Sequence, residues 1–328
     1  MADQAPLDPQ TVRVGFVGLG NVGGKLAGSL LRNGVDVTVR DLDDELVADF
    51  VQRGARAASN PAELAASTDV IITCLPSPAA SAQVLEADDG LLSGWRPGQI
   101  WMEMSTTDEA EVIRLGDKVI TAGGAAVDCP VSGGCHRAAS GNISIFAGCD
   151  RPTFERILPL LTMLGRDVLH TGRLGSASLL KVMTNYLATA NLIAVTEALT
   201  TMAAVDIDLA TTYEAIRISS GTSFVHETES QVILNGSRDI SFTMDLVLKD
   251  IGLFQDIADR AGVPLEMNPL MIEIFRDAAQ HYGEREWSDN VIRRLEDATG
   301  LSITAPGFPA LLVDDEPEVA GAEVVVRR

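Results

Sequence analysis

The chain has little positive charge. Its 328 residues include 25 lysines and arginines against 46 aspartates and glutamates, for a formal net charge of −21. Nucleic-acid binding requires a basic surface that neutralises phosphates, so this balance argues against it. An acidic surface favours solubility. An anionic ligand would therefore need a locally basic pocket.

Cysteine is also scarce. The four cysteines, at positions 74, 129, 135 and 149, form no Cys-x-x-Cys pair. A chain of this length buries a sizeable core without disulfides, so we expect free thiols and a reduced, cytoplasmic compartment. Cys129, Cys135 and His136 are close in sequence, but their spacing matches no standard zinc site, and we expect no metal.

We also expect no membrane segment. The first residues, "MADQAPLDPQ", have neither the basic nor the apolar region of a signal peptide. The longest apolar stretch, residues 176–205, contains Lys181, Asn185, Asn191 and Glu197. A bilayer span is rarely so polar, so this stretch is better explained as a helix of a globular protein.

The first half of the chain alternates β-branched runs with helical segments. It predicts strands at 12–18, 36–41, 69–75, 99–104, 125–130, 142–148 and 166–171. Strands separated by helices form a mostly parallel sheet with helices on both faces. We predict an α/β domain over residues 1–174.

The second half has a different pattern. From Ser176 to about Tyr282 it is helical, with breaks at 221–222, 235–236 and 262–264, which predicts an all-helical domain over 175–305. Its first helix, about thirty residues long, is apolar on most of its circumference, so we expect it to be buried in a core or a subunit interface. Residues 306–328 are acidic and rich in proline, and we expect a loose tail able to lie on a partner subunit.

A glycine loop follows the first strand. Gly18-Leu19-Gly20-Asn21-Val22-Gly23 lies directly between a predicted strand and a predicted helix. In such a loop the first glycine permits a tight turn, the second lets a pyrophosphate approach the backbone, and the third lets helix and strand pack closely. The motif is common on its own, but its context here favours a dinucleotide site over a simple turn.

Asp41 lies at the end of the second predicted strand, where a carboxylate accepts hydrogen bonds from the ribose hydroxyls of NAD. It would repel the 2′-phosphate of NADP. Arg40 could instead accommodate that phosphate, but strand alternation places the two side chains on opposite faces. We therefore predict that Asp41 faces the ribose and that NAD is preferred.

Two polar groups interrupt apolar helices. In "GSASLLKVMTNYL" Lys181 lies among apolar residues, and Asn185 follows one turn later on the same face. A buried ammonium is costly, and a lysine in such a place can exchange a proton with a reacting oxygen. The alternative is a lysine that reaches water from a helix end. A second pair, Lys249–Asp250, together with the glycine loop, favours an active site between the domains.

The segment "DCPVSGG", residues 128–134, follows the fifth predicted strand. Its small residues allow backbone amides and the Ser132 hydroxyl to face a ligand at the carboxyl ends of the strands. An ordinary glycine-rich turn explains the segment equally well.

Together these motifs resemble the β-hydroxyacid dehydrogenase family, which includes 3-hydroxyisobutyrate dehydrogenase. The resemblance covers about residues 12–283, with the glycine loop, "DCPVSGG", Lys181-x-x-x-Asn185 and Lys249–Asp250 in the family's order. It implies a Rossmann-type domain, an all-helical domain that forms a homodimer or homotetramer, and reversible hydride transfer between a small anionic β-hydroxyacid and its semialdehyde or keto form.

The resemblance also implies roles for individual residues. Lys181 is the catalytic acid/base, and substrate is bound by Ser132, Gly133, Gly134 and Asn185. The cofactor is contacted by the residues of the glycine loop and by Asp41, Leu75, Pro76, Thr106, Lys249 and Asp250, Asp250 supporting Lys249. The sequence departs from the family after "SGG", where Cys135-His136-Arg137 replaces small residues. Arg137 can pair with a carboxylate, sulfonate or phosphate of the substrate, or it can point to solvent.

Other functions remain open at this point. An imine reductase shares the architecture, but those enzymes usually lack the lysine. A non-catalytic dinucleotide-binding scaffold is a second alternative, and a short 6-phosphogluconate dehydrogenase a third. The sequence leaves the substrate, the physiological direction and the choice between dimer and tetramer undecided.

Overall fold

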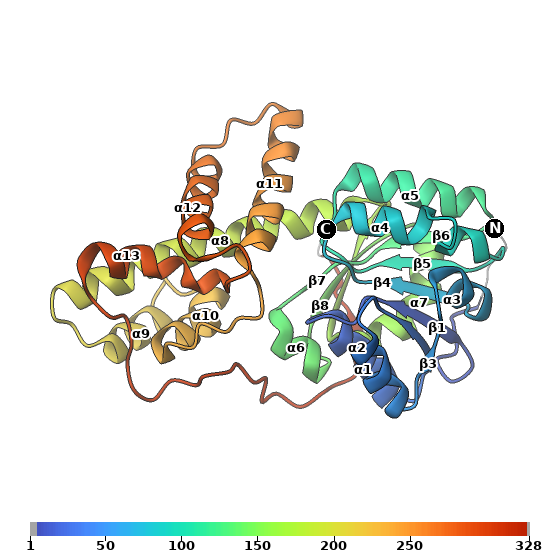
Figure 1. Cartoon of the computed structure of the whole chain (residues 1–328), viewed down its shortest axis with the longest axis horizontal. Helices are drawn as coiled ribbons and strands as arrows, with labels where there is room; N and C mark the ends of the chain where they lie inside the picture. Colours follow the sequence, from blue (N-terminus) through green and yellow to red (C-terminus); the bar gives the residue numbers. More distant parts are fainter. Residues whose placement is uncertain (1–4, 327–328) are drawn as a thin grey trace. The chain divides into compact units, whose positions relative to one another are not determined.

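The computed structural model describes residues 5–326 as two compact units (Figure 1). The N-terminal unit comprises the described residues up to Lys181 together with those from Asp314 onward, and the helical unit spans Val182–Val313. The expected boundary between residues 174 and 175 falls just before helix α8 (Ser176–Ala204), whose first six residues belong to the N-terminal unit.

The N-terminal unit is built on a mostly parallel sheet, as predicted. The strand order is β10-β9-β8-β6-β5-β4-β1-β2-β3, with β7 paired to β8, and β8 runs antiparallel to β6 and β7. The strands are β1 (Arg13–Val17), β2 (Asp36–Arg40), β3 (Arg56–Ala57), β4 (Val70–Thr73), β5 (Ile100–Glu103), β6 (Ala125–Asp128), β7 (Val131–Ser132), β8 (Ser144–Gly148), β9 (Asp167–Gly172) and β10 (Ala322–Glu323). Each of the seven predicted strands is present, and β3, β7 and β10, of two residues each, were not predicted.

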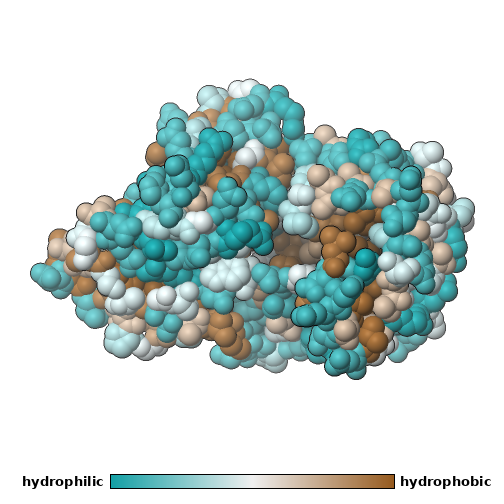
Figure 2. Space-filling view, in the orientation of Figure 1, coloured by the Kyte–Doolittle hydropathy of each residue, from teal (hydrophilic) through white to brown (hydrophobic). Residues whose placement is uncertain are grey.

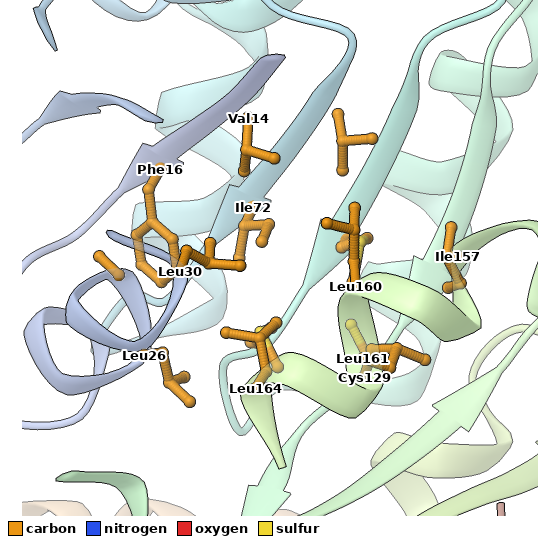
Figure 3. Packing of buried hydrophobic residues seen from close by; sticks show 14 of the residues in the cluster. Val14, Phe16, Leu26, Leu30, Ile72, Cys129, Ile157, Leu160, Leu161 and Leu164 are labelled. Atoms are coloured by element: carbon orange, nitrogen blue, oxygen red, sulfur yellow. The ribbon is translucent and has the colours of Figure 1, made fainter. Parts of the chain in front are cut away.

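Helices connect the strands and supply the core. They are α1 (Gly23–Arg32), α2 (Asp44–Gln52), α3 (Pro61–Ser67), α4 (Pro78–Glu86), α5 (Glu109–Thr121), α6 (Gly134–Ser140) and α7 (Arg151–Leu164). The central strands β4 and β5 are fully buried, which explains their continuous apolar sequences. On one face of the sheet, Val14, Phe16 and Ile72 pack with leucines of α1 and α7 (Figure 3).

The helical unit confirms the predicted pattern. It contains most of α8 together with α9 (Leu209–Arg217), α10 (Phe224–Asn235), α11 (Met244–Ala261), α12 (Met267–Tyr282), the 3-10 helix η2 (Ser288–Ile292) and α13 (Arg293–Thr299). Two of the predicted breaks coincide with helix ends. Gly236 directly follows α10 and Gly262 directly follows α11, and both glycines have the left-handed conformation. Its separate core includes Leu199, Ile233 and Phe275.

Helix α8 is less enclosed than we expected. By length and composition it could cross a membrane, a property that it shares with core helices of soluble proteins. Leu192, Val195 and Leu199 are buried, but Leu187 is 51% exposed in the single chain. One copy of the chain therefore leaves part of α8 uncovered, and burial of that part in a subunit interface stays a prediction. Elsewhere the visible surface is largely hydrophilic, as the net charge requires (Figure 2).

The C-terminal segment is not a loose tail over its whole length. Asn235 and Ser237 donate hydrogen bonds to the carbonyl oxygens of Phe308 and Ala310 in the helical unit. From Asp314 onward the segment belongs to the N-terminal unit, where β10 pairs in parallel with β9. The sequence did not reveal these contacts because the partners are 73 or more positions away along the chain, beyond the reach of any local pattern.

Two neighbouring carboxyl groups, one buried and one partly buried, lie in the helical unit. Asp289 of η2 is fully buried next to Glu229 of α10. Burial raises the pKa of Glu229 to about 7. Burial and the neighbouring Glu229 also raise the pKa of Asp289, and Arg238 opposes this rise only in part. The folded unit therefore favours the protonated forms of both groups.

This pair predicts a loss of stability with rising pH. A carboxyl group whose pKa is higher in the folded state stabilises the fold at low pH, and the stabilisation is lost as pH rises through the folded pKa, here about 7 for Glu229. Glu229→Gln remains neutral at every pH. Between pH 5 and pH 8 we expect its melting temperature to fall roughly 5 °C less than that of the wild type, since each pKa unit corresponds to about 1.4 kcal/mol. The control is Glu273→Gln at an exposed position of α12, and equal falls in all three proteins would contradict the prediction.

Candidate active site

The glycine loop forms a tight connection between β1 and α1. Gly18 has φ +97°, and a Cβ there would lie 2.3 Å from the carbonyl oxygen of Cys74. A Cβ on Gly23 would lie 2.0 Å from the carbonyl oxygen of Gly18. Both positions therefore require glycine. By contrast, no described atom lies within 4 Å of a Cβ on Gly20, so the backbone there faces open space.

Helix α1 begins directly after this open space. Among the described residues, no side chain caps its N-terminus at Val22. Uncapped helix amides and the positive end of the helix dipole are suited to a phosphate group. The geometry thus fits a pyrophosphate against Gly20, as the sequence indicated.

Asp41 connects the glycine loop to the end of β2. Its Oδ2 accepts a hydrogen bond from the backbone N–H of Leu19 at 2.5 Å, and its Oδ1 accepts one from Asp43 at 2.9 Å. A carboxylate has about four acceptor sites, so it can also accept hydrogen bonds from ribose hydroxyls. Arg40 has a different partner, Asp44, with 3.8 Å between Nη1 and Oδ1. Strand β2 ends at Arg40, one residue earlier than predicted.

The loops of Leu75 and Thr106 are brought together by a buried polar network. The Ser105 hydroxyl accepts a hydrogen bond from the backbone N–H of Leu75 at 2.7 Å and donates one to Glu103. Burial raises the pKa of Glu103, while hydrogen bonds from Ser105 partly offset that rise. Sequence reasoning missed Glu103 and Ser105, although one carboxylate in the apolar strand "IWME" was a usable signal.

The "DCPVSGG" segment leads from β6 through β7 into α6. Ser132 is the last residue of β7, and Gly133 and Gly134 form the start of α6. The side chains that depart from the family pattern fold back over these glycines. Arg137 Cδ lies 3.3 Å from where a Cβ on Gly133 would be, and the His136 ring lies 2.8 Å from the equivalent point on Gly134. Arg137 is therefore next to the predicted substrate loop.

Asp128 fixes the start of α8 to the end of β6. The fully buried carboxylate accepts hydrogen bonds from Gly175 N at 2.7 Å and Ser178 N at 2.8 Å. Burial raises its pKa, whereas these backbone hydrogen bonds lower it. We predicted the segment that Asp128 begins but not this role, because Gly175 is 47 positions away.

Lys181 lies on α8 three residues, less than one turn, after Ser178. Its side chain is buried, with 7% of its surface exposed, and it belongs to the N-terminal unit. Most of the residue is therefore enclosed by protein, which fits the predicted acid/base role. Asp128 thus connects, within one unit, the predicted substrate loop and the helix that carries the predicted acid/base.

Three further predicted residues meet in the helical unit. Asn185 Nδ2 donates a hydrogen bond to Asp250 Oδ2 at 2.5 Å, and Lys249 Nζ lies 2.9 Å from Asp250 Oδ1. Asp250 is only 1% exposed, so its charge is balanced by Lys249 in a dry environment. This arrangement fixes the Asn185 amide and the Lys249 ammonium in place.

The contacts of Asp128 predict a specific loss of stability. Asp128→Ala removes both hydrogen bonds to the start of α8, and we expect the free energy of unfolding, measured in guanidinium chloride, to fall by about 2 kcal/mol, the upper range for a lost helix cap. Asp128→Asn retains one acceptor oxygen and should fall between Asp128→Ala and the wild type. Wild-type stability in Asp128→Ala would rule out this role.

Comparison with known proteins agrees with this geometry. Residues 13–172 match the model of the NAD-binding domain of 6-phosphogluconate dehydrogenase, and residues 175–295 match the NAD-binding domain of NADP-dependent 3-hydroxyisobutyrate dehydrogenase. The 2-(hydroxymethyl)glutarate dehydrogenase of Eubacterium barkeri is 32% identical over 296 residues, 90% of this chain and 98% of the relative. The 3-sulfolactaldehyde reductase of Escherichia coli is 29% identical, over 88% of this chain and 97% of the relative.

A solved structure shows the same architecture. The 3-hydroxyisobutyrate dehydrogenase of Salmonella typhimurium superposes with a TM-score of 0.80 at 28% identity, over 86% of this chain and 99% of that one. Imine reductases, such as that of Myxococcus stipitatus, share only the fold, at 16% identity and a TM-score of 0.60. The chain therefore belongs to the 3-hydroxyisobutyrate dehydrogenase family and is an NAD(P)-dependent β-hydroxyacid dehydrogenase.

Proposed function

We propose that the chain is an NAD-dependent dehydrogenase that interconverts a small anionic β-hydroxyacid and its semialdehyde or keto form, with Lys181 as the acid/base. The observation that carries the proposal is the buried Lys181 on a helix whose start is anchored to the "DCPVSGG" segment by Asp128. Burying an ammonium costs free energy, and buried ionisable groups of this kind are concentrated at functional sites.

The preference for NAD rests on Asp41. Its carboxylate lies against the glycine loop, where it accepts the Leu19 N–H. A fixed negative charge in that place favours ribose hydroxyls and disfavours a 2′-phosphate. Arg40, paired with Asp44, is the residue that would accommodate NADP instead.

In the proposed reaction the residues of the chain transfer the proton and bind and orient the substrate. A nicotinamide dinucleotide, when bound, supplies the hydride acceptor or donor. Lys181 Nζ accepts the proton of the substrate hydroxyl in oxidation and returns it to the carbonyl oxygen in reduction. Asn185, held by Asp250, orients the substrate, and the Ser132 hydroxyl with the amides of Gly133 and Gly134 binds its anionic group.

The substrate class is inferred from Arg137. The Arg137 side chain begins beside Gly133, and its guanidinium can form a bidentate pair with a carboxylate, sulfonate or phosphate. Two relatives carry names of compatible substrates, 2-(hydroxymethyl)glutarate with two carboxylates and 3-sulfolactaldehyde with a sulfonate. A substrate with a second anionic group uses both the glycine amides and Arg137.

The proposal includes a homo-oligomeric assembly and a cytoplasmic location. The partly exposed apolar side chains of α8, such as Leu187, are suited to a homodimer or homotetramer formed through the helical unit. The cysteines are free thiols, which suits a reduced cytoplasmic compartment.

Lysine chemistry at position 181 can be tested directly. Lys181→Arg retains the positive charge but cannot release a proton near neutral pH, and Lys181→Met retains only the apolar stem. We expect both variants to lose at least about 100-fold in kcat while the Kd for NAD changes by less than about twofold. Turnover is followed at 340 nm. Near wild-type turnover in Lys181→Arg would show that charge, not proton transfer, is what matters at this position.

The substrate class can be tested with a panel of β-hydroxyacids that includes dicarboxylates, sulfonates and phosphates, assayed with NAD and then with NADP. We expect a rate with NAD and preference for a doubly anionic acid. Arg137→Leu should raise KM for that acid roughly 10- to 100-fold, the cost of losing a charged hydrogen-bonding pair, while a singly anionic analogue is little affected.

The comparison of the two substrate types provides the control, and Arg137→Lys should restore part of the affinity. Equal effects on both substrates would remove Arg137 from substrate recognition. If no β-hydroxyacid in the panel is oxidised but a cyclic imine is reduced, the result would favour an imine reductase. If the chain binds the cofactor but turns over no substrate, the result would favour a non-catalytic scaffold.

A further inference from the structure

The strongest unexplained feature is the C-terminal segment, residues 314–323, which lies beyond the family match that ends at residue 295. We call these residues the C-terminal strap. Every described residue of the strap belongs to the N-terminal unit. It therefore returns to the sheet that carries the predicted cofactor and substrate loops.

Acidic side chains anchor the strap to arginines of that unit. Glu316 pairs with Arg166. Glu323 pairs with Arg151 through two contacts, of 2.5 and 2.9 Å. Backbone hydrogen bonds then align β10 with β9, including one from Ala322 N to Arg166 O at 2.8 Å. The strap is thus tied down at several places along its length.

Asp314 connects the strap to the end of α6. Its Oδ2 accepts hydrogen bonds from the Ser140 hydroxyl at 2.5 Å and from Asn142 Nδ2 at 2.8 Å. Asn142 is 1% exposed, and its Nδ2 also donates to the Glu316 carbonyl at 3.1 Å. These hydrogen bonds hold the carboxylate in one orientation.

Helix α6 needs an external support of this kind. It has seven residues, and a helix so short is not stable by itself. Its start is the predicted substrate loop, Gly133–Gly134, and Arg137 lies in its middle. Just after its end, the backbone N–H of Asn142 donates to the carbonyl oxygen of Arg137 at 2.9 Å, and the Ser140 hydroxyl, whose single proton Asp314 and this oxygen share, lies 3.1 Å from the same oxygen. The residues that Asp314 holds are therefore the ones that hold the Arg137 backbone.

The charge of Asp314 acts on the same region. Its carboxylate interacts electrostatically with Arg137 and with His136, the two side chains that fold over the substrate glycines. A fixed negative charge near Arg137 limits where that guanidinium can lie.

We propose that Asp314 is a positioning residue for substrate binding: through Ser140 and Asn142 it fixes α6, and thereby the placement of Gly133, Gly134 and Arg137 around the substrate's anionic group. The inference rests on the proposed function. It makes the C-terminal strap a determinant of substrate affinity.

The test compares Asp314→Ala with Asp315→Ala. Both variants remove one negative charge, at adjacent positions, but Asp315 is exposed and Asp314 is partly buried against α6. For Asp314→Ala we expect KM for the preferred acid to rise about tenfold, with kcat and the Kd for NAD within about twofold, because the loss falls on substrate placement and not on the proton-transfer group. Asp315→Ala should behave as the wild type.

A second measurement is independent of turnover. Amide hydrogen exchange reports local opening, so residues 134–142 should exchange faster in Asp314→Ala than in Asp315→Ala, while β4 and β5 stay protected. If the wild type turns over no hydroxyacid, the proposed function fails, and the exchange of α6 still decides the role of Asp314.

Three results would overturn the inference: unchanged KM and unchanged exchange of α6 in Asp314→Ala, an equal rise of KM in Asp315→Ala, or a fall in kcat with KM unchanged. If Asp314→Ala does not fold, Ser140→Ala removes one of the two donors. It should then raise KM about threefold, since only one of two hydrogen bonds is lost.

Discussion

The Asp128 carboxylate is the contact on which the rest of the candidate site depends. It sits at the end of β6 and accepts hydrogen bonds from two backbone amides at the start of α8. Strand β6 leads into the predicted substrate loop, and α8 carries Lys181 less than two turns later. One buried group thus sets the distance between the part of the sheet that would bind an anion and the ammonium that would transfer a proton.

Other buried or partly buried polar groups have the same kind of role. Ser105 and Glu103 hold the Leu75 loop, Asp41 holds the glycine loop, and Asp250 holds Asn185 and Lys249. Each is a carboxyl group, or depends on one, that accepts hydrogen bonds from a neighbouring segment. In a protein interior such bonds are strong and directional, so they fix loops more tightly than apolar packing can. Rigid loops reduce the entropy that is lost when a ligand binds.

Most of the fold could be predicted because it depends on local patterns. The apolar runs of β1, β4 and β5, the glycine loop and the helix ends at Gly236 and Gly262 all have signals within a few residues. The Asp128–Gly175 hydrogen bond and the anchoring of Asp314 had none, because their partners are far away in sequence. The short strands β3, β7 and β10 were missed because two residues are too few for a periodic pattern.

Those short strands have a consequence for how copies of the chain can associate. The sheet begins with β10 and ends with β3, each two residues long. A long unpaired edge strand exposes backbone amides and carbonyls that can form hydrogen bonds with a strand of another molecule. Proteins limit such pairing by keeping edge strands short. Strand β10 covers the first two residues of β9, Asp167 and Val168, and so shortens the edge that another molecule could extend. A chain shortened before β10 would leave the outer edge of β9 open from Asp167 onward, a longer edge than the one that β10 leaves.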